Sequence, residues 1–423
     1  MKMIPIPYYL KFILVALLVW LFYSGIFLPE YFHFRTESNG FHYFKDLAYS
    51  FLHGHTDVRC PAYPDCHDLS EFHGKNYLYW PPVPAIIYMP WVAIFGLNTP
   101  DDLIVSIIGF LNVLFFMLVL KQMAKWFQLN ISDNLIAWFG IFWGLGTVHF
   151  YMSMNSSVWF FAQVVAQLVL LTSIYMLLIA KGKTGILLSG LLFAGAVFSR
   201  NHLIFSIPFF VCIYAYKFGK IKWFQHSISF GIPILLAFIL NGWYNYARFG
   251  DVMNNGLYYQ NIHPYFKENF ENFGFFSFHY IPENFFIEVL KFPKFQAAFP
   301  LLLMDYDGFG LLWNSPVFLF LIPAVILIFF QWKTKLMLNW LFVTSLISSV
   351  CIALLVFSIM GPGWVQFASR YSLDYQFFLI IPIVILFHWY PNKKWMKYAS
   401  VIPLLWSIFS NFAGVYLFYG IGI

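Results

Sequence analysis

Long apolar runs separated by short polar connectors are the feature that most limits how this chain can fold. An α-helix needs about 20 apolar residues to cross a bilayer. Eleven runs approach or reach that length, at 10–29, 102–120, 134–151, 157–180, 184–199, 202–217, 227–247, 313–331, 336–358, 372–390 and 398–419. Only 10% of the 423 residues are charged, against about 25% in soluble domains. The sequence predicts an all-α polytopic membrane protein, one transmembrane domain over 1–423 with about eleven transmembrane helices.

The lysines give the chain a direction across the membrane. Cytoplasmic connectors of membrane proteins are enriched in lysine and arginine. If the short apolar segment 84–97 is a juxtamembrane helix and not a span, fourteen of the nineteen lysines fall on one side. Counting 84–97 as a span would invert every later connector and destroy this pattern. We therefore predict a cytoplasmic amino terminus, an external carboxyl terminus and a prokaryotic plasma (inner) membrane as the location.

Two long polar segments then lie outside, at 30–101 and 251–312. In the first, the residues from 40 to 53 are predicted to form an amphipathic juxtamembrane helix, because its apolar side chains recur at helical spacing. These are Phe41, Phe44, Ala48 and Phe51. Such a helix lies in the interface plane. We expect the chemistry of the protein to take place in this first external loop or just beneath it, with the second loop as a wall.

Two carboxylates of the first loop are candidates for a general base. Glu37 lies between the first span and the predicted helix, where partial desolvation raises the pKa of a carboxyl. The alternative for Glu37 is a charge that stabilises the amino terminus of the helix. Asp46, on the helix itself, is the second candidate.

The arginines are distributed against the usual trend, since all five fall outside: Arg35, Arg59, Arg200, Arg248 and Arg370. A guanidinium binds phosphate with two parallel hydrogen bonds. Arg370, in the sequence GPGWVQFASRY before a span, is the first candidate for a donor phosphate, and Arg200, in SRNH, is the second. The alternatives for Arg370 are a lipid headgroup anchor or an ion pair with Asp374, four residues later.

Cysteine and histidine add two smaller expectations for the first loop. Cys60 and Cys66, in CPAYPDC on the external side, predict a local disulfide, with two free thiols as the alternative. A patch rich in histidine and aspartate is a candidate site for a divalent metal ion, although it shows no regular ligand spacing. It comprises His53, His55, Asp57, Asp65, His67 and Asp68, and solvated loop residues are the alternative reading.

The order of motifs along the chain resembles the GT-C-type glycosyltransferases, which include the protein O-mannosyltransferases and the transferases that place aminoarabinose on lipid A. The matching residues are Leu47-Ala48, Leu52, Gly54, Tyr77, Tyr79, Pro81-Pro82, Pro84, Pro90, Phe95-Gly96, Gly146-Thr147, Ser157-Val158-Trp159, Asn245 to Gly250, Asp307 to Gly310, Ser315-Pro316 and Arg370-Tyr371. The resemblance covers most of the chain. It implies that a sugar is donated from a polyprenyl phosphate on the external face and transferred with inversion, after a loop-one aspartate deprotonates the acceptor.

This sequence departs from that family where the base is expected. The relatives carry an Asp-Glu pair just before the interfacial helix, and Asn39 and Gly40 stand there when Tyr43 and Gly54 are aligned. Asparagine is no base at neutral pH, so the resemblance leaves Glu37 or Asp46 for that role, or a divergent or inactive relative. His42 takes the place of a basic residue of the lipid A transferases, and their lysine before the prolines is Trp80 here. By this resemblance His42 joins Arg370 and Arg200 as donor-phosphate candidates, and Asn39, Tyr43 and Tyr79 line the substrate pocket.

The predicted function is therefore transfer of a hexosyl or pentosyl group from a polyprenyl-phosphate donor to a protein, lipid or glycan acceptor in the cell envelope. No Gly-rich phosphate loop follows a strand, so no nucleotide cofactor is expected, and the dispersed basic residues argue against nucleic acid as a partner. Two alternatives stay open. One is a transporter or flippase for a lipid-linked saccharide, which would need interrupted helices around a midplane site. The other is a non-catalytic scaffold.

Overall fold

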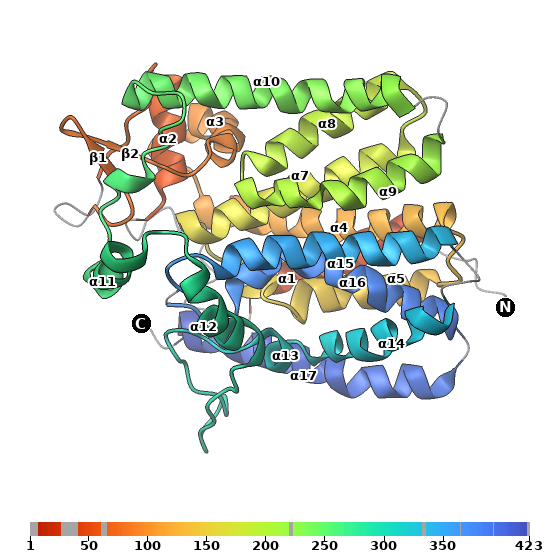
Figure 1. Cartoon of the computed structure of the whole chain (residues 1–423). Coiled ribbons are helices and arrows are strands. Elements are labelled where there is room, and N and C mark those ends of the chain that lie inside the picture. Colours follow the sequence, from red (N-terminus) through yellow and green to blue (C-terminus); the bar gives the residue numbers. More distant parts are fainter. Residues whose placement is uncertain are drawn as a thin grey trace.

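A computed structural model of the chain describes residues 7–26, 41–60, 66–219, 223–331, 336–363, 365–391 and 393–420. Long helices lie side by side in a stack, and the short elements gather at one end of it (Figure 1). The helices are α1 (Tyr8–Tyr23), α2 (Tyr43–Leu52), α3 (Val83–Phe95), α4 (Asp101–Trp126), α5 (Asp133–Leu145), α6 (His149–Met152), α7 (Val158–Ile179), α8 (Lys183–Val197), α9 (Ile207–Phe218), α10 (Trp223–Phe249), α11 (Pro264–Phe273), α12 (Ile281–Phe285), α13 (Leu311–Asn314), α14 (Leu321–Gln331), α15 (Leu336–Phe357), α16 (Leu373–Trp389) and α17 (Lys394–Gly420). A two-stranded antiparallel hairpin, β1 (Ser70–Phe72) and β2 (Lys75–Tyr77), completes the described fold.

The predicted apolar runs coincide with helices. Within the described residues, six helices are long and apolar enough to cross a membrane: 101–126, 158–179, 226–249, 336–357, 370–389 and 394–419. Four apolar helices are shorter, among them α1 and α8. Other predicted runs are interrupted, such as 134–151, which divides into α5 and α6. The protein is thus an integral all-α membrane protein. Because several of the predicted spans are shorter or interrupted helices, the count of eleven spans stays a prediction.

Packing of side chains between neighbouring helices and interhelical hydrogen bonds stabilise the stack. The ring of Phe116 on α4 stacks on Trp143 of α5 at 5.0 Å between centroids. The Asn112 side chain on α4 donates to the Val164 carbonyl of α7 at 2.9 Å. Hydrogen bonds between polar side chains and a neighbouring helix are a main source of helix association in lipid, because apolar surface gains little there.

The lysine-rich connectors meet at one end of the stack. The Lys217 ammonium near the end of α9 donates to the carbonyls of Leu177 and Leu178 on α7, both at 2.7 Å. The Tyr216 hydroxyl donates to the Trp126 carbonyl, the last residue of α4, also at 2.7 Å. The ends of α4, α7 and α9 therefore lie together, and the long polar segments belong to the opposite end (Figure 1).

At that opposite end, the first polar segment folds onto the stack as α2, the hairpin and α3. The predicted helices at 40–53 and 84–97 correspond to α2 and α3. The first turns of α2 are more buried than an interfacial helix with one apolar face should be, since Lys45 and Asp46 are also buried. Ion pairs compensate these two charges: Lys45 lies 2.5 Å from Asp101, and Asp46 lies 2.9 Å from Arg59.

The two polar segments are joined by backbone hydrogen bonds. The Asp68 amide donates to the Asn261 carbonyl at 3.1 Å, and the Asn261 amide donates to the Leu69 carbonyl at 2.8 Å. From the end of α10, the Arg248 guanidinium donates to the Leu78 carbonyl at 2.7 Å. The second segment is therefore fixed to the first.

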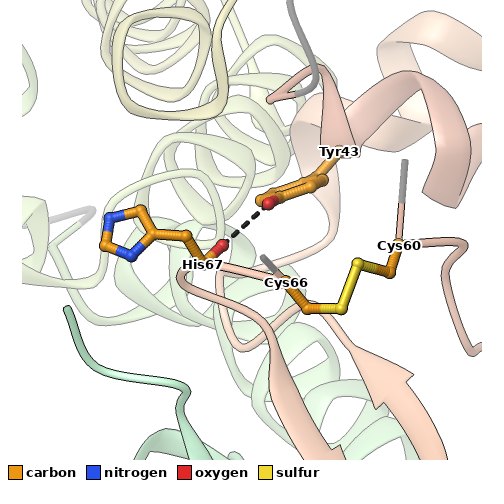
Figure 2. Close-up of a disulfide and its surroundings, with 4 residues drawn as sticks. All are labelled: Tyr43, Cys60, Cys66 and His67. Carbon is orange, nitrogen blue, oxygen red and sulfur yellow. Dashed lines mark hydrogen bonds between the residues drawn. A yellow bond between two sulfur atoms is a disulfide. The ribbon is translucent and has the colours of Figure 1, made fainter. Parts of the chain in front are cut away.

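Cys60 and Cys66 form a disulfide in the first segment (Figure 2). Nearby, the Tyr43 hydroxyl of α2 donates to the His67 carbonyl at 2.7 Å. The disulfide and this hydrogen bond attach the residues before the hairpin to α2 from two sides.

Replacing Cys60 and Cys66 by serine should lower the free energy of unfolding by about 2 kcal/mol, because a crosslink over so short a loop removes limited entropy from the unfolded chain. Thermal unfolding in detergent measures the loss, and Cys351→Ser on α15, a free cysteine, is the control. A double variant that melts with wild type and with the control would contradict this.

Candidate functional site

A cavity of about 470 Å³ opens between the two polar segments and the adjoining helix ends. Its wall combines aromatic rings with a few polar groups. The first segment contributes Phe41, His67, Asp68, Tyr79 and Trp80, and the second contributes Gln260, His263, Phe266 and Phe275. Helix ends and their connectors contribute Trp159, Phe160, Arg370, Tyr371 and Phe418. A concave, mostly apolar site with few polar groups is the usual form of a small-molecule pocket.

Arg370 is the basic group of this cavity. It begins a 3₁₀ turn, Arg370–Ser372, just ahead of α16, and its side chain is buried. Its guanidinium carbon lies 5.1 Å from the ring centre of Tyr371 and 5.6 Å from that of Phe160. Within the described part of the chain it makes no ion pair, and its Nε has no hydrogen-bond partner. A buried charge without an ion pair is costly, which makes this guanidinium the candidate group of the cavity for binding an anion.

Gln366 fixes the backbone from which Arg370 projects. Its side-chain oxygen accepts from the Arg370 amide at 3.1 Å, and its side-chain nitrogen donates to the Asp307 carbonyl at 2.9 Å and to Glu288 at 3.2 Å. Glu288 also accepts a short hydrogen bond from the Ser369 hydroxyl. The second polar segment thus holds Arg370 in place through Glu288 and Asp307.

Gly363 packs directly against the guanidinium. Its φ is +82°, and a methyl group there would lie 2.8 Å from the Arg370 Nε and from the Gln366 side-chain oxygen. Only glycine satisfies both conditions without displacing the arginine.

The variant Gly363→Ala should weaken binding of the polyprenyl phosphate predicted from the sequence about tenfold, equivalent to about 1.4 kcal/mol, because the methyl group pushes the guanidinium aside. Binding to purified protein in detergent measures it. Gly54→Ala, at a positive φ of 76° with nothing within 4 Å, carries the same backbone strain far from Arg370. If both substitutions weakened binding equally, backbone strain would account for the loss, and displacement of the Arg370 guanidinium would not.

The second predicted arginine has a different role from Arg370. The Arg200 guanidinium lies 2.9 Å from Asp374, and the His202 Nε2 lies 2.8 Å from the same carboxylate oxygen. Asp374 therefore pairs with Arg200 and not with Arg370, contrary to the alternative based on spacing. The 3₁₀ turn explains the difference, because positions four apart share a face only in an α-helix. Arg200 is not among the cavity-lining residues, and its contact with a donor phosphate stays a prediction.

The other predicted residues are divided between the cavity and the interior. Tyr79 lines the cavity. Tyr43 is buried against the first segment and binds the His67 carbonyl. The His42 Nδ1 lies 3.1 Å from Asp101 and 2.9 Å from the Ser156 hydroxyl, so one ring nitrogen of this donor-phosphate candidate is engaged within the protein. Asp46 pairs with Arg59 outside the cavity lining, and burial raises the pKa of its carboxyl while Arg59 opposes that rise.

Glu37 and Asn39 lie outside the described residues. The choice between Glu37 and Asp46 as base is thus still the one made from sequence. As for metal, no group of three or more candidate ligands gathers within the described ranges. His53 and His55 are exposed at and just after the carboxyl end of α2, and Asp57 pairs with Lys75 at 3.2 Å.

Sequence reasoning missed two acidic groups that the fold brings to this region. Asp68, noted only as part of the metal patch, lines the cavity. Glu288, in the π-helical turn Phe286–Leu290, was not singled out at all. Burial raises the pKa of Glu288 to about 7, with the Ser369 and Gln366 hydrogen bonds opposing the rise. No local pattern marks either residue, because their partners are distant in sequence.

The raised pKa of Glu288 makes stability depend on pH. Below its ordinary value of 4.5 the carboxyl is protonated in both folded and unfolded chains. Between 4.5 and about 7 it ionises only in the unfolded chain, so the free energy of unfolding falls as pH rises. Glu288→Gln should remove up to about 3 kcal/mol of this dependence and melt above wild type at pH 8.

Thermal unfolding in detergent from pH 5 to pH 8 tests this. Glu283→Gln, at an exposed glutamate on α12, is the matched control and should keep the wild-type slope. Parallel curves for wild type and Glu288→Gln would contradict the assignment.

The fold is found in solved glycosyltransferases. The apo oligosaccharyltransferase of Archaeoglobus fulgidus matches with a TM-score of 0.51 and 13% identity, over 97% of this chain and 55% of that one. The same protein tethered with an acceptor peptide containing the NVT sequon gives 0.51 and 12%, with 97% and 55% covered. ArnT from Cupriavidus metallidurans, bound to undecaprenyl phosphate, gives 0.40 and 12%, with 96% and 59% covered. No family model matches, and no curated protein matches in sequence.

These comparisons establish structural similarity to GT-C glycosyltransferases over nearly the whole chain. The chain spans about half the length of the oligosaccharyltransferase it matches. The resemblance is to membrane glycosyltransferases that use lipid-linked donors.

Proposed function

We propose that this protein is an inverting membrane glycosyltransferase that takes a hexosyl or pentosyl group from a polyprenyl-phosphate donor. The observation that carries the proposal is the buried guanidinium of Arg370, which lines the cavity and forms no ion pair with the described residues, its Nε having no hydrogen-bond partner there. A phosphate monoanion or dianion supplies the missing charge. The GT-C-like fold supports the same reaction class.

The cavity lies at the end of the stack where a lipid-linked donor would meet an external acceptor. The opposite end carries the lysine-rich connectors and therefore faces the cytoplasm. In this proposal eleven spans form one domain over 1–423, with the external loops 30–101 and 251–312 above the plasma membrane. The polyprenyl chain extends into lipid, and the acceptor is a protein, lipid or glycan.

The proposed reaction breaks one bond and forms another at the anomeric carbon. The acceptor hydroxyl oxygen attacks that carbon from the side opposite the phosphate, and its proton passes to a carboxylate, Glu37 or Asp46. The bond between the anomeric carbon and the phosphate oxygen breaks, and polyprenyl phosphate leaves with the bonding electrons. Arg370 stabilises the charge that develops on the leaving oxygen, which is the interaction that lowers the barrier.

Transfer of radiolabelled sugar from polyprenyl-phosphate donors by purified protein in detergent tests this proposal. Arg370→Ala should reduce transfer about 100-fold, the usual effect of removing one charge-stabilising donor. Lys75→Ala, an equal charge change on the exposed strand β2, should leave transfer unchanged. Glu37→Gln and Asp46→Asn identify the base, since only the variant that lacks it should lose turnover while still binding donor.

Three results would contradict parts of the proposal. Full transfer by Arg370→Ala would remove the phosphate assignment. Transfer that survives both carboxylate changes would remove both base candidates. Absence of transfer from any donor, with undecaprenyl phosphate still bound, would favour a flippase or a non-catalytic scaffold.

A further inference from the structure

Asp68 is the acidic group of the cavity, and two N–H groups orient its carboxylate. The Trp159 indole N–H donates to Oδ2 at 2.8 Å, and the Gln260 side-chain amide donates to Oδ1 at 2.5 Å. The His67 Nε2 lies 3.5 Å from Oδ2. A carboxylate has about four acceptor positions, so one position, on Oδ1, stays open after these three contacts with the described residues.

The surroundings of Asp68 hold its backbone in a left-handed conformation that residues other than glycine rarely adopt. Its φ is +62°, a left-handed value that is strained for a residue other than glycine and persists where the surroundings impose it. The neighbouring His67 carbonyl is bound by Tyr43, and Cys66 is in the disulfide (Figure 2). The Asp68 amide is bound by Asn261. Anchors from three segments thus fix one carboxylate.

Aromatic rings stand beside this carboxylate. The Trp159 ring lies 5.1 Å from the Phe41 ring and 6.2 Å from the His67 ring, and all three residues line the cavity. The hydrogen bond from the indole edge to Asp68 fixes the plane of the Trp159 ring. A fixed carboxylate next to a fixed aromatic surface suits a sugar, whose hydroxyls donate hydrogen bonds and whose C–H face packs on rings.

Asp68 and Arg370 also give the cavity wall one negatively charged and one positively charged side chain. Aside from histidine, they are the charged residues of its described wall. Both act on the hydroxyl of Tyr79: Asp68 adds to the rise in its pKa that burial causes, and Arg200 and Arg370 oppose it. The wall therefore offers an anion-binding group and a hydroxyl-binding group within electrostatic reach of the same tyrosine.

We propose that Asp68 and Trp159 form a carbohydrate subsite that binds a neutral or amino-bearing pyranose through its hydroxyls and excludes uronic acids. The inference rests on the proposed function for its place in the reaction. The ring it binds belongs either to the donor or to a saccharide acceptor. A carboxylate-bearing sugar would meet the Asp68 charge at close range, which costs binding free energy without a compensating cation.

The test compares probes that differ only in the sugar: farnesyl phosphate alone, and farnesyl phosphate carrying glucose, mannose or glucuronate. Wild type should bind a neutral glycosyl probe about tenfold more tightly than farnesyl phosphate, and glucuronate should add nothing. Asp68→Asn should lose the gain for the neutral sugar, keep wild-type affinity for farnesyl phosphate, and bind the glucuronate probe more tightly than wild type does. That gain is not expected if Asp68 is merely structural. Asp57→Asn, the same change at a solvent-facing ion pair of the same loop, should resemble wild type.

A second variant keeps the inference testable if Asp68→Asn does not fold. Trp159→Phe preserves an aromatic ring but removes the N–H that orients Asp68, and it should reduce the gain for the neutral sugar without changing farnesyl phosphate binding. Methyl glucoside and methyl mannoside, added to protein that holds farnesyl phosphate, identify the source. Binding of a glycoside that depends on Asp68 assigns the subsite to the acceptor, and binding confined to the glycosyl phosphates assigns it to the donor.

Some outcomes overturn the inference alone and others the phosphate site. Retention of the sugar gain by a folded Asp68→Asn or by Trp159→Phe rejects the subsite. So does wild type that binds farnesyl phosphate but gains nothing from any neutral sugar, and the proposed phosphate site then stands. Asp68-dependent glycoside binding without any affinity for farnesyl phosphate would reject the phosphate site and keep the subsite.

Discussion

Lipid hydrocarbon offers no hydrogen bonds, and this constraint determines where the protein keeps its polar groups. Backbone donors and acceptors must be satisfied within helices, so the described chain is a stack of apolar helices with its irregular segments at the ends. Lysine connectors occupy one end. The two long polar segments occupy the other, where they bind each other through backbone hydrogen bonds between 68–69 and 261. A cavity able to do chemistry forms only where irregular backbone is shielded by protein.

Among the described residues at that end, carboxylates form ion pairs with some of the arginines but not with Arg370. Asp46 neutralises Arg59, and Asp374 neutralises Arg200. Arg370 receives no such partner among the described residues, and the nearby Glu288 is engaged by Ser369 and Gln366 instead. Because burial also raises the pKa of Glu288 to about 7, its charge is incomplete at neutral pH. The arrangement leaves Arg370 without an ion pair among the described residues, as the proposed phosphate site requires.

The sequence predicted those features that depend on residues close together in the chain. Apolar run lengths predicted the long helices, helical spacing predicted α2, the distribution of lysines predicted α3 as a juxtamembrane helix, and the external placement of Cys60 and Cys66 predicted the disulfide. Local spacing failed at Asp374, because a 3₁₀ turn intervenes before α16. It could not find the surroundings of Asp68 either, since Trp159 and Gln260 are 91 and 192 residues away. Contacts of that range are decided by how helices pack, which spacing does not encode.

The bond from Gln260 to Asp68 has a consequence for how the protein is made. Chains are synthesised from the amino terminus at about 5–20 residues per second, so Asp68 emerges many seconds before its partner 192 residues later exists. The disulfide needs only the seven residues from Cys60 to Cys66 and can close early. The first loop can therefore be crosslinked before the second loop, which completes its hydrogen bonds, has been synthesised. Arg370 is synthesised later still. The cavity is among the last features of the molecule to be assembled.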